Sequence, residues 1–142
     1  MSDSDLMKLY SQRILALAAD IPHLGRLPAP AFSATRRAPL CGSTVTVDVC
    51  ISDGKISAFS QEVKACALGQ AAAAVLGAVV VGRSRVEILR ARDQLSAMLK
   101  QDGPVPADPF GGYEVLISAR DYPNRHASIL LALNATLDAM PE

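Results

Sequence analysis

The sequence carries no net charge and no long basic or apolar run. Its 142 residues include 14 Lys and Arg against 14 Asp and Glu. No Lys/Arg-rich run forms a footprint for nucleic acid or anionic lipid. The apolar stretch from Cys66 to Val81 is interrupted by Gln70 and falls short of the roughly 20 residues that span a bilayer. We therefore expect no nucleic-acid partner and no membrane span, and we interpret this stretch as a core helix.

The amino terminus, "MSDSDLMKLY", also lacks the basic and continuous apolar regions of a secretory signal. This favours a cytoplasmic location. Half of the residues are hydrophobic, and the length suits one compact domain over residues 1–142.

Cysteine is scarce, with only three residues: Cys41, Cys50 and Cys66. An odd number of cysteines in a reducing compartment does not suggest a disulfide framework. No C-x-x-C or H-x-x-x-H spacing closes a zinc site by itself. Metal binding, reactivity or packing must therefore explain these thiols.

Periodic patterns predict an α+β fold. A strand pattern with an Asp53-Gly54 turn signal predicts a hairpin near residues 44–64, and prolines confine 31–37 to an edge strand. Helical spacing predicts a first helix capped by Ser4 or Asp5. The other expected helices are the core helix before Gly82, one that follows a capping box at 84–87, and a closing helix that begins near His126; residues 113–123 could be a helix or a bend. We expect an antiparallel sheet of about three strands packed against four to five helices.

Cys66 should lie at or just before the first turn of the core helix. Unpaired backbone N–H groups and the helix dipole favour a thiolate there, the form that binds metal and attacks sulfur. The alternative is a small buried hydrophobic residue among alanines. Cys41 stands in a turn beside Gly42, which would let a ligand approach the backbone closely, and Ser43 adds a hydroxyl.

The other candidates carry weaker signals. Cys50 lies inside a strand pattern, on the face opposite Val49, and we interpret it as structural. His23 follows a proline in a loop and suggests no specific role. His126 should be anchored and partly exposed at the start of the last helix; it matters only if it meets Cys41 and Cys66.

Three blocks of the sequence resemble the NifU/IscU-like, SufU-type family of iron–sulfur cluster assembly scaffolds. The blocks are "CGS", "VKACALGQAAA" and "YPNRHASILLAL", and they occur in the family's order and spacing from about Ala31 to Met140. The resemblance implies a fold like the NifU/IscU N-terminal domain. Its cysteines and an aspartate would converge at one end to hold a nascent [2Fe–2S] cluster, iron or zinc.

Carried over to this sequence, the family pattern implies that Cys41, Cys66 and His126 bind metal and that Cys66 accepts sulfur. The implied partners are a cysteine desulfurase and recipient apoproteins. Two positions depart from the pattern: Ser43 replaces the aspartate, and Ala127, or Ser128 under a one-residue shift, replaces the third cysteine. Because iron in such clusters usually has four protein ligands, a stable cluster would need a ligand from Ser43, solvent, a small thiol or a second subunit.

Three functional hypotheses follow from these residues. The first is a scaffold without catalytic turnover that transiently binds iron, a [2Fe–2S] cluster or zinc. The second is a metal-free homologue that acts as an interaction or regulatory partner in cluster assembly. The third, a thiol hydrolase that uses Cys66 and His126, has little support because no oxyanion-hole motif or orienting residue can be named.

Overall fold

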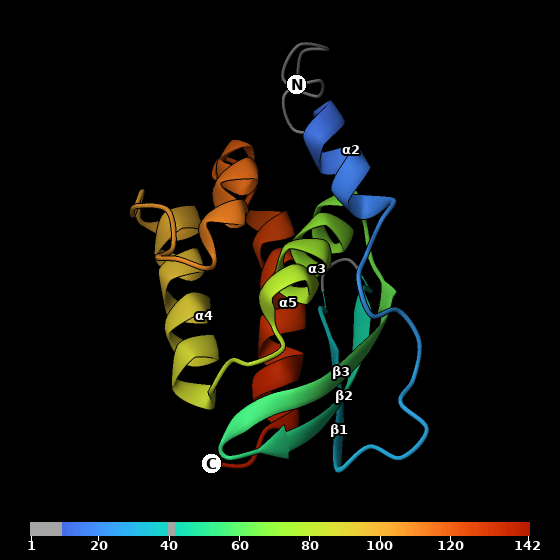
Figure 1. The fold of residues 1–142 in the computed structure, drawn as a ribbon. Helices are drawn as coiled ribbons and strands as arrows, with labels where there is room; N and C mark the ends of the chain where they lie inside the picture. The colour runs from blue at the N-terminus through green and yellow to red at the C-terminus, as the bar shows by residue number, and fades with distance from the viewer. Residues whose placement is uncertain (1–9, 40–41) are drawn as a thin grey trace.

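The computed structural model describes residues 10–39 and 42–142, which form a three-stranded antiparallel sheet with helices (Figure 1). The elements in chain order are α2 (Gln12–Ala18), β1 (Phe32–Arg37), β2 (Thr44–Ser52), β3 (Lys55–Lys64), α3 (Ala67–Val79), α4 (Arg85–Lys100), the 3₁₀ helix η1 (Gly111–Ala119) and α5 (Pro123–Ala139). The strand order is β1-β2-β3. This confirms the predicted α+β class and the three strands.

The predicted hairpin joins β2 to β3. Asp53 and Gly54 both have positive φ angles, 53° and 76°, as a type I′ turn requires. The turn sets a register in which Val49 faces Phe59 and Thr44 faces Lys64. β1 pairs with the other side of β2, with Arg37 opposite Thr44. The end of β1 at Arg37, the start of β2 at Thr44 and the end of β3 at Lys64 therefore lie side by side.

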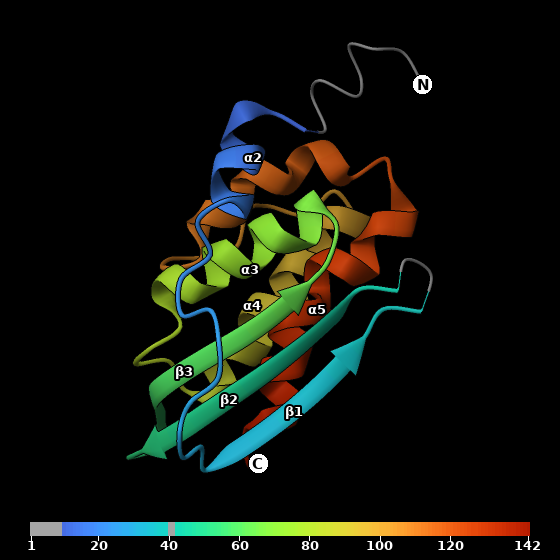
Figure 2. The same ribbon diagram turned by 90° about the vertical axis from the view of Figure 1, so that its right-hand side faces the viewer.

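Helices cover one face of this sheet (Figure 2). α5 packs against β1, β2 and α3, and the inward side chains Val45, Val47 and Val49 are buried in the same hydrophobic core as Leu133. α3 supplies mostly small buried residues, as its alanine-rich sequence predicts. Small side chains let α3 approach the first turns of α5 closely, and this contact positions the candidate site.

The opposite face of the sheet is also covered in part, because the segment between α2 and β1 crosses it (Figure 2). Asp48 points to this face and is fully buried. Its carboxylate accepts hydrogen bonds from Arg26, the Leu27 amide, Ser33 and Ser60. These bonds, the Arg26 guanidinium first, hold the pKa of Asp48 well below its usual range although burial acts in the opposite direction.

Several predicted boundaries can be compared with the structure. The capping box of Ser84 and Glu87 opens α4 as predicted, and the ambiguous 113–123 segment lies mostly in η1. α5 begins at Pro123 rather than near His126, because proline is well suited to the first helical turn. α2 is capped by Ser11; the predicted caps Ser4 and Asp5 lie outside the described residues.

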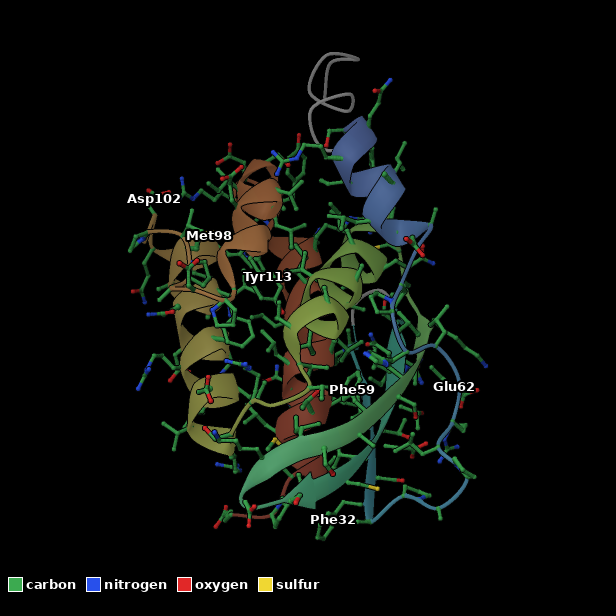
Figure 3. The ribbon with its side chains drawn as sticks, in the orientation of Figure 1. Phe32, Phe59, Glu62, Met98, Asp102 and Tyr113 are labelled. Carbon is green, nitrogen blue, oxygen red and sulfur yellow. The ribbon has the colours of Figure 1, made fainter. Side chains whose placement is uncertain are left out.

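Tyr113 and Phe59 are two of the aromatic side chains buried in the hydrophobic core. Figure 3 shows Tyr113 among η1, α4 and α5, and Phe59 between β3 and the helices. Burial raises the pKa of the Tyr113 phenol, so that side chain stays neutral. Among residues 10–39 and 42–142, no helix is both long and apolar enough to cross a membrane.

Candidate functional site

Cys66 is the N-cap residue of α3, as the sequence predicts. Its backbone is extended, with φ −66° and ψ 169°, and its carbonyl accepts the first helical hydrogen bond, from Gln70 N at 2.9 Å. The thiol is half-buried and makes no hydrogen bond to the first turn. It therefore lies beside the unpaired N–H groups at the positive end of the α3 dipole.

One serine hydroxyl adjoins this thiol, and a second serine contacts the first. Ser128 Oγ, in α5, lies 3.6 Å from Cys66 Sγ and 3.1 Å from Ser43 Oγ. Ser128 is only 1% exposed and Ser43 only 3%. The structure thus brings together three positions that are far apart in the sequence: the cysteine of the second block, the serine of the first block and a serine of the third.

Two backbone hydrogen bonds to Ala38 hold Ser43 and Gly42 in this place. The Ala38 amide donates to the Ser43 carbonyl at 2.8 Å, and the Gly42 amide donates to the Ala38 carbonyl at 3.0 Å. Gly42 has a φ of 70°, a conformation that glycine adopts without strain. Cys41 lies outside the described residues, so its role as a ligand stays a prediction, although its neighbour Ser43 reaches Ser128.

His126 is not partly exposed as we expected. It is 5% exposed, and its Nε2 lies 2.9 Å from the carbonyl oxygen of Ala119. A carbonyl only accepts, so Nε2 carries the proton of this bond. The imidazole, which lies in the first turn of α5, thus contacts Ala119, the last residue of η1. A metal at Nε2 would first have to break this link between η1 and α5.

The neighbours Ala127 and Ser128 face different surroundings. Ala127 is exposed, whereas Ser128 is buried against Cys66. A Cβ on Gly69 would come within 2.5 Å of Ser128 Oγ. Gly69 is therefore the residue that lets the two helices meet here, and sequence reasoning missed it. The only signal for it was a glycine inside an otherwise alanine-rich helix.

The remaining cysteine and histidine candidates stay apart from this cluster. Cys50 is half-buried on β2, with its Sγ 3.8 Å from the Ala29 carbonyl oxygen. His23 packs edge-on against Phe59, with ring centroids 6.1 Å apart. Among the residues that the structure describes, no three His, Cys, Asp or Glu side chains form a group that could hold a metal ion.

Comparisons with known proteins point to one group of proteins. No protein-family model matches the chain. The solved N-terminal structure of a nitrogen-fixing NifU-like protein from Brucella abortus is 41% identical, covers 95% of this chain and 94% of its own, and superposes with a TM-score of 0.91.

Two further proteins are more distant. The iron–sulfur cluster assembly scaffold protein IscU of Streptococcus pyogenes is 27% identical over 103 residues, 72% of this chain but 64% of its own length. A crystal structure titled as a putative iron–sulfur cluster assembly scaffold protein for the SUF system, from Fervidobacterium islandicum, shares the fold at 19% identity. Its TM-score is 0.83, over 95% of this chain and 98% of its own.

Proposed function

Because the chain belongs to the NifU/IscU-like family of iron–sulfur cluster assembly scaffolds, we propose that it works in cluster assembly as a scaffold. In this role it accepts sulfur from a cysteine desulfurase, holds iron, zinc or a [2Fe–2S] cluster transiently, and delivers its cargo to apoproteins. It does not act as an enzyme. The observation that carries the proposal is the Cys66 thiol at the N-terminus of α3, joined to Ser128 and Ser43 of the other two family blocks.

The proposed sulfur transfer is a thiol–persulfide exchange. The Cys66 thiolate attacks the terminal sulfur of a persulfide on the donor cysteine. A new S–S bond forms at Cys66, the donor's S–S bond breaks, and the donor cysteine leaves as a thiolate. No external oxidant or reductant is needed. The location of Cys66 at a helix N-terminus suits this attack, because the dipole favours the anionic sulfur.

The cargo would be held by the thiolates of Cys66 and Cys41. Thiolates are the preferred ligands of iron–sulfur clusters and also suit zinc with an open position. Ser43 and Ser128 supply hydroxyls, which are poor metal ligands, and His126 is bonded to Ala119. The chain therefore needs further ligands from a small thiol or a second copy to close a four-ligand site, which suits transient holding.

Anaerobic reconstitution tests this function. The protein is incubated with iron, cysteine and a cysteine desulfurase, and visible absorption, bound metal and protein-bound sulfane sulfur are measured. We expect sulfur and metal in the parent protein and a loss of both in Cys66→Ser, with Cys50→Ser as the matched control. Colourless protein that acquires neither sulfur nor metal, and that Cys66→Ser leaves unchanged, would contradict the proposal.

A metal-free interaction role is the second candidate. The observation in its favour is that Ser43, which replaces the family aspartate, bonds to Ser128, which replaces the third thiol if the alignment shifts by one residue. On this hypothesis the protein binds a desulfurase or another scaffold with equal affinity after Cys41→Ser and Cys66→Ser substitution. Calorimetric titration with the purified desulfurase separates the two, since the scaffold hypothesis requires sulfur transfer and not only binding.

A further inference from the structure

Two basic side chains lie at the end of the sheet nearest Cys66. Arg37 ends β1 and Lys64 ends β3, and both are paired with Thr44 of β2. Directly opposed residues of an antiparallel sheet point to the same face, so Arg37, Thr44 and Lys64 form one row across the outer face. With strands roughly 4.8 Å apart, the Cα atoms of Arg37 and Lys64 are about 10 Å apart, within reach of one ligand.

This row adjoins the candidate site on both sides. Lys64 lies two residues before Cys66 in the chain. On the other side, a guanidinium nitrogen of Arg37 would lie 4.0 Å from a Cβ placed on Gly42, beside Ser43. Ser43 in turn connects through Ser128 to Cys66. The two cations therefore lie at the ends of β1 and β3, close in the chain to Ser43 and Cys66.

Neither cation is neutralised by an acidic neighbour in the part of the chain that the structure describes. Both side chains are exposed, and neither makes an ion pair within residues 10–39 and 42–142. The nearest acid in register is Glu62, one row further along the outer face of β3, where Figure 3 places it away from the helices. Glu62 is paired with Arg26 at 3.7 Å, which leaves the Arg37–Lys64 row positive.

The positive charge of Arg37 and Lys64 would assist the sulfur transfer proposed for Cys66. In thiol–persulfide exchange both the attacking thiolate and the donor persulfide are anions, so they repel each other as they approach. Positive charge near the thiol reduces this repulsion over about a Debye length, roughly 8 Å at physiological ionic strength, and raises the local concentration of an anionic donor. We propose that Arg37 and Lys64 form a cationic rim that recruits anionic sulfur donors to Cys66, an inference that rests on the proposed sulfur-acceptor function.

Two small disulfides test the rim without the desulfurase. Dithiobis(nitrobenzoate) carries two carboxylates, whereas dithiodipyridine is neutral, and both react with a thiolate by the same exchange. Rates are measured in a Cys41→Ser/Cys50→Ser background, where Cys66 is the sole thiol. A change in the thiolate fraction or the accessibility of Cys66 affects both rates alike. The ratio of the two rates therefore reports only the effect of the reagent's charge.

We expect Arg37→Glu/Lys64→Glu to slow the anionic reagent about 5- to 10-fold and to change the neutral reagent less than 2-fold. Arg37→Gln/Lys64→Gln should lie between it and the parent, and high salt should remove the difference. Lys55→Glu is the matched control, because Lys55 is an exposed cation at the far end of the same strand. An unchanged ratio in the double variant, or an equal loss in Lys55→Glu, would overturn the rim.

The desulfurase assay keeps this inference separate from the proposed function. If Arg37 and Lys64 accelerate the anionic reagent but the protein takes no sulfur from the desulfurase, the cationic rim is supported and the proposed function is contradicted. If sulfur transfer depends on Cys66 but the rate ratio does not change when Arg37 and Lys64 are substituted, the proposed function is supported and the cationic rim is contradicted.

Discussion

The contact between Cys66 and Ser128 depends on a single glycine. Gly69 faces Ser128 with space for no side chain: a Cβ there would lie 2.5 Å from Ser128 Oγ, 2.9 Å from Ala65 Cβ and 3.2 Å from the Ser128 carbonyl oxygen. Rotation of the serine hydroxyl would relieve only the first of these contacts. The contact with the Ser128 carbonyl is relieved only if α3 and α5 separate, and the contact with Ala65 only if the residues that lead into α3 also shift.

Gly69→Ala should therefore destabilise the protein, although alanine is the better helix former by about 1 kcal/mol. Overpacking in a dense core typically costs about 1 to 3 kcal/mol, and the substitution must also displace Ser128. We expect a net loss of about 1 kcal/mol in urea unfolding, partly recovered in Gly69→Ala/Ser128→Ala. A stabilised Gly69→Ala variant would show that the helices have room to separate at this point.

At the scale of elements, the sequence predicted what local chemistry determines. The Asp53-Gly54 turn, the capping box at Ser84 and the placement of Cys66 before α3 each follow from a few adjacent residues, and each is confirmed. The prediction that His126 is partly exposed was wrong, because its burial depends on contact with η1, a segment whose conformation the sequence left open. No local pattern predicts the contact between Ser43 and Ser128, since it joins residues 85 positions apart; only the family resemblance implied that these two regions converge.

Another long-range contact, at the end of α4, makes a testable case. Arg120 Nε donates to the Met98 carbonyl at 2.7 Å, and an NH2 of the same guanidinium donates to the Gly103 carbonyl at 2.8 Å. These bonds satisfy carbonyls at and beyond a helix C-terminus, where a cation is also favourable. Arg120→Met should reduce the free energy of unfolding by about 2 kcal/mol, measured in urea.

Arg120→Lys is the informative companion to that variant. It keeps the charge at the end of α4 but not the two-pronged donor geometry, so it should recover less than half of the loss. Full recovery would indicate that charge alone, and not the pair of hydrogen bonds, stabilises this end of the helix.

At the scale of the whole molecule, the sheet is covered on two faces by different means. Its inner face packs apolar side chains against α3 and α5, and its outer face holds the segment before β1 through polar contacts centred on Asp48. The strand pattern places Asp48, like Cys50, on the face opposite Val49. It did not predict that Asp48 would be fully buried, since the covering segment is rich in proline and carries no periodic signal.

Asp48 should consequently make stability depend on pH. Its pKa in the folded protein lies below the unfolded value of about 3.9, so its contribution is fully present above that pH and is lost as the pH falls through the folded pKa. Asp48→Asn should lower the free energy of unfolding by about 3 kcal/mol at pH 7, because it leaves Arg26 and two hydroxyls without the carboxylate. The difference from the parent should shrink as the pH falls below about 4, because the carboxyl group then becomes protonated in the unfolded parent while it stays ionised in the folded one. Urea unfolding at both pH values measures this, with Asp53→Asn in the exposed turn as the control, and a gap that stays constant with pH would mean that the buried charge does not hold the segment to the sheet.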